Sequence, residues 1–139
     1  MASNLTFTMI KPEAMRKGYA GGILKMIQEA DFEIIALKMR HLSVDEAQEF
    51  YAIHSERPFY IDLVAFMSSG PIISAVLKKD NAVEDFRKLI GSTDPSEAAE
   101  GTVRKAFATN KTMNAVHGSD SDDNAKIEMD FHFSANEIF

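Results

Sequence analysis

Each half of the chain shows the order strand, helix, strand, and this order limits the folds open to it. The expected strands alternate apolar with polar residues or form short apolar runs bounded by turn residues. They cover Leu5–Ile10, Phe32–His41, Ile72–Leu77 and the short run from Met113 to Val116 before His117. The pattern predicts an α+β fold in which helices pack on a sheet.

Helix signals lie between these strands. Ser43 and Glu46 match the capping box, in which a serine hydroxyl and a glutamate three residues later satisfy free N–H groups at a helix start. The pair Arg57-Pro58 ends that helix, whereas Asp80 or Asn81 starts a later one that Gly91 ends. Helices are also expected over about residues 22–30, 61–67, 102–107 and 122–131, with a second capping-box match at Ser134–Glu137.

The order of elements predicts a ferredoxin-like fold, βαββαβ, in which helices cover a four-stranded antiparallel sheet. A doubly wound parallel fold would fit the same alternation. We favour the antiparallel sheet because the turn at Ser68–Pro71 follows a pair of helices rather than a glycine-rich strand-to-helix turn. No repeat, low-complexity segment or linker interrupts residues 1–139, so we expect a single domain.

Composition excludes several classes of protein. The chain has 21 acidic and 15 basic residues and a net charge of −6, which argues against a protein that coats nucleic acid. It has no cysteine, so disulfides, thiolate catalysis and cysteine-bound zinc are excluded. Neither a basic leader nor an apolar run of membrane-spanning length occurs, so a cytoplasmic protein is expected.

The segment Asn114–Ser121, Asn-Ala-Val-His-Gly-Ser-Asp-Ser, is the strongest candidate for a functional site. It places His117 at a strand end, before a glycine and small polar residues typical of a helix start. Neutral imidazole is a nucleophile, and helix N-termini attract anions. The segment predicts a nucleophile beside a phosphate, although a lone histidine in such a place is more often a hydrogen-bonded structural residue.

Common phosphate and metal motifs are missing from the sequence. Neither G-x-x-x-x-G-K-[ST] nor G-x-G-x-x-G occurs, and the four histidines lack metal-ligand spacing. We therefore expect no metal site built by the protein itself. Phosphate chemistry would depend on side-chain cations, backbone amides and a metal that arrives with the substrate. Lys11, directly after the first expected strand, is one such cation.

Six short motifs occur in order along the chain: Lys11-Pro12, Arg57-Pro58-Phe59, Ser69-Gly70-Pro71, Gly91–Pro95, Gly101–Arg104 and Asn114–Ser121. Each is weak alone. Together, in register from about Leu5 to Phe133, they resemble the nucleoside diphosphate kinase family. The resemblance implies a phosphotransferase with a ping-pong reaction, in which His117 takes the γ-phosphoryl group of a nucleoside triphosphate and passes it to a nucleoside diphosphate.

The same resemblance implies roles for residues around the histidine. Lys11 would neutralise the transferred phosphate and reach the ribose, which Asn114 would also bind. Tyr51 would hydrogen-bond near the histidine and the incoming phosphoryl group. Glu128, supported by Ser119, would accept from the imidazole nitrogen that is not phosphorylated.

The remaining implied roles concern the nucleotide. Arg87, Thr93 and Arg104 would hold the phosphates, and Mg²⁺ would arrive bridging those phosphates. Phe59 would stack on the base without reading its edge, with Leu63 as a second apolar candidate. Taken singly, each of these residues is more simply a solvated, salt-bridged or core residue. Their joint occurrence favours the site for all of them except Ser119 and Leu63, for which the simpler interpretation is kept.

The chain also departs from the family pattern. Ile53 stands where many members carry an acidic residue, and Lys111 where others often place an aliphatic residue or threonine beside the base. Neither position touches the nucleophile or the phosphate ligands. A homo-oligomer built from dimers is implied, with nucleoside di- and triphosphates as partners. The alternative hypothesis is a regulatory module on the same fold that binds nucleotide without turnover.

Overall fold

A computed structural model describes residues 4–139 and places four strands in one antiparallel sheet. The strands are β1 (Leu5–Ile10), β2 (Glu33–Arg40), β3 (Ile72–Lys78) and β4 (Val116–Gly118), in the spatial order β2-β3-β1-β4. The order and pairing confirm the expected ferredoxin-like fold and exclude the doubly wound parallel alternative. Residues 1–3, where the sequence shows no basic leader, lie outside the described residues.

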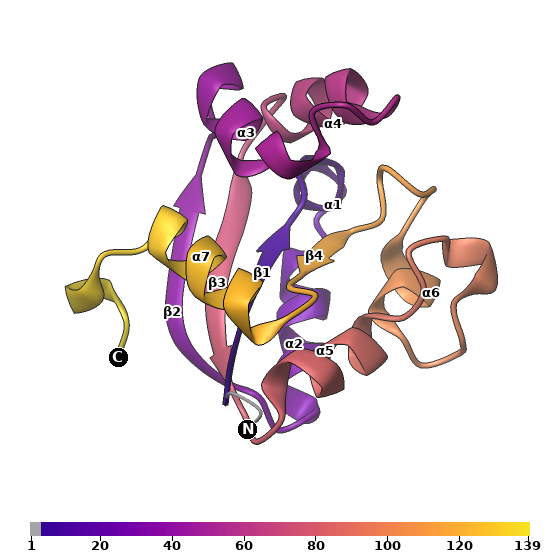
Figure 1. Ribbon diagram of the computed structural model, residues 1–139. Helices are drawn as coiled ribbons and strands as arrows, with labels where there is room; N and C mark the ends of the chain where they lie inside the picture. The colour runs from indigo at the N-terminus through magenta and orange to yellow at the C-terminus, as the bar shows by residue number, and fades with distance from the viewer. Residues whose placement is uncertain (1–3) are drawn as a thin grey trace.

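Helices cover both faces of the sheet (Figure 1). One face carries α1 (Pro12–Arg16), α2 (Ala20–Glu29), α5 (Ala82–Ile90) and α6 (Val103–Phe107), and the other carries α3 (Val44–Phe50), α4 (Tyr60–Met67) and α7 (Asp122–His132). Short 3₁₀ helices occur at η1 (Ala52–His54), η2 (Pro95–Glu97) and η3 (Ala135–Glu137). Within residues 4–139, no helix combines the length and apolar character needed to span a bilayer.

The central strands β1 and β3 are buried on both faces and divide the apolar residues into two cores. Phe7 and Met9 of β1 pack under α3, α4 and α7, whereas Ile10 packs with residues of α2 and α5. In Figure 1, α7 crosses in front of β1 and β3. The short strand β4 lies at the edge of the sheet, so its side chains meet both the α7 side and the α5 side.

Most of the helix starts that the sequence predicts are present in the structure. At the start of α3 both capping-box bonds form, because Glu46 N donates to Ser43 Oγ at 3.0 Å and Ser43 N donates to Glu46 Oε1 at 2.9 Å. Asn81 starts α5 as expected, but with a left-handed φ of 57° and no side-chain cap. Helix α1 was not expected. It begins at Pro12, whose missing N–H has no cost in the first turn of a helix.

Candidate active site

A cavity of about 750 Å³ opens beside β4 and is lined by residues of α3, α5, α6 and α7. It brings together predicted residues from distant segments of the chain: Lys11, Arg87, Thr93, Arg104, His117 and Glu128. Because its wall carries lysine and arginine side chains and a histidine, the cavity is suited to an anionic ligand. The other predicted residues, Tyr51, Phe59, Leu63, Asn114 and Ser119, do not line the cavity.

His117 lies in β4, opposite Met9 of β1. Its Nε2 is 2.9 Å from Glu128 Oε1 on α7. A carboxylate only accepts hydrogen bonds, so Nε2 carries the proton and Nδ1 carries the lone pair. No protein group in the described part of the chain bonds to Nδ1, and the ring lines the cavity. Nδ1 is therefore the nitrogen that a ligand can reach.

Ser119 fixes the carboxylate from the other side. Its Oγ donates to Glu128 Oε1 at 2.6 Å, which is the oxygen that also accepts from His117. The backbone N of Ser119 donates to Phe7 O at 3.3 Å and so ties the segment after β4 to β1. The orientation of the histidine ring is thus determined by a helix and by two strands together.

Aromatic side chains pack around the same ring. Phe50 of α3 lies 5.6 Å from the His117 ring at an interplanar angle of 78°, and Phe7 lies 6.1 Å from it. The neighbouring Tyr51 is buried, and its hydroxyl has no hydrogen-bond partner among the described residues. Burial, and then the charge of Glu128, raise the pKa of Tyr51 well above its usual range. The phenol is therefore a neutral donor without an acceptor.

The glycine after the histidine packs closely against α5. A Cβ atom on Gly118 would lie 2.8 Å from Ile90 Cδ1 and 3.2 Å from Phe86 Cδ2, both on α5. A larger residue would require the side chains of Ile90 and Phe86 to shift. The His-Gly pair therefore keeps His117 close to α5, which brings Arg87 to the cavity.

A tight γ-turn precedes β4 and is held by Arg104. Val116 N donates to Asn114 O at 2.9 Å, and Ala115 between them has a φ of 72°, which is strained for a residue with a side chain. Arg104 Nε donates to Asn114 O at 3.3 Å and Nη2 to Val116 O at 2.9 Å, while Nη1 donates to Gly91 O at 2.9 Å. A guanidinium carries more N–H groups than these bonds use, so donors remain for a ligand.

Lys11 is the most deeply buried cation at the cavity, with 7% of its surface exposed. Its Nζ donates to Asn114 Oδ1 at 2.7 Å, and Asn114 Nδ2 donates to Thr93 O at 3.4 Å. Burial, and then the charge of Arg104, lower the pKa of Lys11 to about 7. The lysine therefore titrates near neutral pH until an anion stabilises its charged form.

Arg87 and Thr93 occupy the exposed outer part of the cavity. Burial, and then the charge of Arg87, lower the pKa of Arg104 to about 10, so the Arg104 guanidinium is charged at neutral pH. Neighbouring like charges repel each other, and an anion between them relieves that repulsion. The predicted phosphate ligands Arg87 and Arg104 are thus brought to one wall.

The residues predicted to contact a base lie apart from this wall. Phe59 precedes α4 with 46% of its surface exposed, and its ring packs 5.6 Å from that of His54, which lines the cavity. Leu63 is buried in the apolar core, as expected for a core residue. Lys111 lines a second, shallower cavity of about 510 Å³ with Asp62, Phe66 and residues 110–113.

Sequence reasoning did not select several other cavity residues: Glu49, Phe50, His54, Ser92, Asp120, Asn124, Ile127 and Phe131. The sequence did point to Asp120 and Asn124, since both belong to the run of polar residues that follows His117. Asn124 Nδ2 donates to Asp120 Oδ1 at 2.6 Å, and Asn124 N donates to the cap Ser121 Oγ at 3.1 Å. The phenylalanines gave no such signal, because apolar residues on amphipathic helices predict core packing.

Comparison with known sequences gives one consistent family. A family model described as nucleoside diphosphate kinase matches residues 4–138. A nucleoside diphosphate kinase of Flavobacterium psychrophilum is 60% identical over 139 residues, which covers 100% of both chains. Another, from Chlorobaculum parvum, is 54% identical over 133 residues and covers 96% of this chain and 95% of its own.

Solved structures agree with the sequences. The nucleoside diphosphate kinase of Aquifex aeolicus superposes with a TM-score of 0.94 at 46% identity, covering 98% of this chain and 99% of its own. The enzyme of Halobacterium salinarum, solved in complex with CDP, gives a TM-score of 0.93 at 31% identity, covering 97% of this chain and 90% of its own.

Proposed function

The chain belongs to the nucleoside diphosphate kinase family, and from this membership we propose how its own residues carry out the reaction. The enzyme transfers the γ-phosphoryl group of a nucleoside triphosphate to a nucleoside diphosphate. We propose that a phosphohistidine at His117 carries the group between them. The main support is the bond of 2.9 Å between His117 Nε2 and Glu128 Oε1, since it leaves Nδ1 free at a cationic cavity.

In the first half-reaction the lone pair of His117 Nδ1 attacks the γ-phosphorus and forms a P–N bond. The P–O bond to the β-phosphate breaks, and the nucleoside diphosphate leaves with that electron pair. The ring becomes positively charged, and Glu128 stabilises it through the Nε2–H bond. A phosphoramidate keeps much of the transfer potential of the anhydride, so a second diphosphate can reverse the steps at the same site.

The cavity cations stabilise the charge that spreads over the phosphate oxygens. Lys11 neutralises the transferred phosphate, and Arg87, Thr93 and Arg104 hold the phosphates of the nucleotide. The unpaired hydroxyl of Tyr51 gains an acceptor when a phosphoryl oxygen arrives beside His117. A buried donor without a partner costs about 1–3 kcal/mol, so this bond favours the occupied site.

The nucleoside is held by fewer groups. Asn114 and Lys11 bind the ribose, and the exposed ring of Phe59 stacks on the base. A π-face accepts any base, which fits an enzyme that acts on many nucleotides. The protein would therefore recognise a nucleotide by its phosphates and its sugar rather than by the identity of its base.

The reaction of this family generally needs a divalent metal, and we propose Mg²⁺ bound to the nucleotide phosphates. The donor set fits this arrangement, because lysine and arginine bind phosphate oxygens, while Asp120 and Asn124 supply oxygens suited to the water shell of Mg²⁺. The bound metal would supply neutralisation of phosphate charge.

We further propose one domain over residues 1–139, a cytoplasmic location and a homo-oligomer built from dimers. The outer strand β2 exposes Leu37 by 52% and Met39 by 66%, and an exposed apolar edge strand readily pairs with a second copy. Light scattering tests the oligomeric state. We expect the parent protein to have the molar mass of an oligomer and Met39→Lys to have a lower one. A monomeric parent protein would contradict it.

Labelled ATP tests the phosphohistidine. After incubation with γ-labelled ATP, we expect acid-labile, alkali-stable label on the parent protein and none on His117→Ala. Label that survives in the variant would refute the assignment. Tight ADP binding without transfer to GDP would instead favour the non-catalytic nucleotide-binding module.

A further inference from the structure

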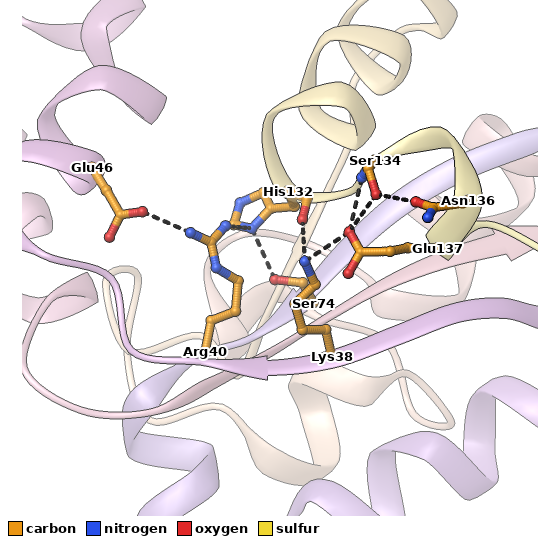
Figure 2. Close-up of polar contacts among 8 residues, drawn as sticks. All are labelled: Lys38, Arg40, Glu46, Ser74, His132, Ser134, Asn136 and Glu137. Atoms are coloured by element: carbon orange, nitrogen blue, oxygen red, sulfur yellow. Dashed lines mark hydrogen bonds and ion pairs between the residues drawn. The ribbon is translucent and has the colours of Figure 1, made fainter.

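His132 ends α7 in a polar cluster on the face of the sheet that also carries His117 (Figure 2). Its Nδ1 lies 2.8 Å from Arg40 Nη1 of β2 and 3.1 Å from Ser74 Oγ of β3. Arg40 also pairs with Glu46 of α3 at 2.7 Å. The histidine is only 3% exposed, so a polar ring is buried where an apolar one would need no partners.

The bonds of His132 determine its protonation. Arginine can only donate, so Nδ1 accepts from Arg40 and the proton lies on Nε2. Burial, followed by the charges of Arg40, His117 and Lys38, lowers the pKa of His132 to about 3, so the ring is neutral. Across the described chain its Nε2–H has no partner. An unpaired buried donor is costly, so stability alone does not account for a histidine here.

The main chain at this end of α7 is also fixed. Lys38 Nζ donates to His132 O at 2.9 Å and to Glu137 Oε1 at 3.0 Å (Figure 2). A cation at a helix C-terminus is favourable because it bonds the last carbonyls and complements the helix dipole. Strands β2 and β3 thus hold both the side chain and the backbone of the last turn.

The proposed catalytic carboxylate, Glu128, lies on the same face of α7 as His132, one turn earlier in the helix. Glu128 and His132 are four residues apart on α7, so they lie on one face with about 6 Å between them along the axis. The two histidines also share their aromatic neighbours. Phe7 lies 4.8 Å from the His132 ring and 6.1 Å from the His117 ring, and Phe50 lies 5.2 Å and 5.6 Å from them.

We propose that His132 is a positioning residue for phosphoryl transfer. By accepting hydrogen bonds from Arg40 and Ser74 it sets α7 on the sheet, so that Glu128 meets Nε2 of His117. This inference rests on the proposed roles of His117 and Glu128. If His132 acts in this way, activity depends on the hydrogen-bond acceptor at its Nδ1 rather than on the bulk of its ring.

Two substitutions separate these properties. His132→Phe keeps the aromatic packing and removes the acceptor, whereas His132→Asn places an amide oxygen near the position of Nδ1 and loses the ring. We expect kcat to fall about tenfold in His132→Phe with KM unchanged, and less than about threefold in His132→Asn. Thermal stability should show the reverse order, because asparagine leaves a cavity. If the variant with the lower melting temperature also had the lower kcat, the proposal would be overturned.

Nitrogen-15 NMR of the His117 ring gives a readout that a merely structural residue would not move. We expect His132→Phe to lower the population of the Nε2–H tautomer of His117, and His132→Asn to preserve it. Should His132→Phe fail to fold, Ser74→Ala removes one partner of Nδ1 and should lower kcat about twofold at constant KM. An unchanged tautomer in His132→Phe, or unchanged kcat in both His132→Phe and Ser74→Ala, would overturn the proposal.

Two controls complete the experiment. Lys126→Ala breaks an exposed ion pair with Asp130 on the far side of α7 and should leave kcat unchanged. In a Glu128→Gln background, His132→Phe should cause no further loss, and an additive loss would contradict the proposed route through Glu128. Absence of phosphoenzyme in the parent protein would refute the proposed function itself, whereas a labelled parent with a fully active His132→Phe would refute only the positioning role.

Discussion

The proposed phosphate end and the proposed base end of the site are built in different ways. At the phosphate end, Lys11, Arg104 and Asn114 are buried and hydrogen-bonded to one another or to backbone carbonyls before a ligand arrives. At the proposed base end, Phe59 is 46% exposed and its ring lies 5.6 Å from that of His54. The comparison shows that burial and hydrogen bonding are concentrated where we propose that a bond is made and broken.

This difference has a physical reason. Phosphoryl transfer needs the nucleophile and the cations fixed to within a fraction of an ångström, because they stabilise charge that develops only in the transition state. Stacking on a base contributes binding energy alone and tolerates a looser geometry. Substitutions at the phosphate end should therefore lower kcat, and those at the base end should raise KM.

The largest effect is expected for His117→Ala. Removal of the nucleophile should lower kcat at least about 10⁴-fold, while the melting temperature stays close to that of the parent because the ring faces the cavity. Steady-state assays with ATP and a second diphosphate, together with calorimetry, measure both quantities. His41→Ala, whose exposed ring bonds to Ser68 O, is the matched control. If His117→Ala turned over at close to the parent rate, the contrast between the two ends of the site would not hold.

Glu128→Gln should have the next largest effect. The amide can still face the ring but carries no charge to balance a phosphorylated imidazole, so kcat should fall about tenfold to a hundredfold with little change in KM. Rapid-quench measurement of phosphoenzyme formation isolates this step. Asp130→Asn, on the exposed side of the same helix, serves as the control. A loss that appears in KM alone would argue against the role of Glu128.

The pKa of Lys11, lowered to about 7, predicts a pH dependence of binding. Below pH 7 the lysine is already charged, whereas above it the free protein loses the proton and must regain it when the phosphates bind. ADP affinity should therefore fall as the pH rises, by up to about tenfold between about pH 7.5 and 8.5, with proton uptake on binding. Calorimetry in buffers of different ionisation enthalpy measures that uptake. Lys11→Arg, which stays charged, should bind without it, and equal uptake in both proteins would contradict the prediction.

Phe59→Ala is expected to have the smallest effect. Loss of stacking should raise KM about fivefold and leave kcat nearly unchanged, with equal changes for purine and pyrimidine nucleotides. Substrate competition assays compare the bases directly. A large fall in kcat would mean that the base end also orders the reacting groups.

Local chemistry allowed much of the fold to be predicted from the sequence. The capping box at Ser43 and the apolar run of β3 depend on nearby residues, and both appear in the structure. The expected end of the helix after Ser43 at Arg57-Pro58 was wrong, because α3 already ends at Phe50 and a short 3₁₀ helix follows it. Helix α1 was not expected, because a proline directly after a strand is typical of a strand end, although it also fits the first turn of a helix. Asn81 was expected to cap through its side chain, but its left-handed backbone provides the turn instead.

The site was less accessible to local reasoning. Lys11 and Asn114 are joined by a bond of 2.7 Å across a sequence separation of 103 residues, and only the family resemblance suggested that they meet. The cluster of Arg40, Ser74 and His132 had no resemblance to support it. In the sequence these residues are a strand cation, a residue in an apolar run and a histidine near a helix end, and only the sheet order brings them together.

Arg104 bonds to carbonyl oxygens of residues 91, 114 and 116, which every amino acid possesses. The location of this positive charge is therefore insensitive to side-chain drift at those positions, provided that the backbone keeps its path. That path is constrained at Gly91 and Ala115, where φ is 87° and 72°. Mutational tolerance around the guanidinium should follow backbone conformation. A library randomised at these two positions should retain glycine at 91, where a Cβ atom would lie 2.7 Å from Thr102 Oγ1, and should disfavour β-branched residues at 115.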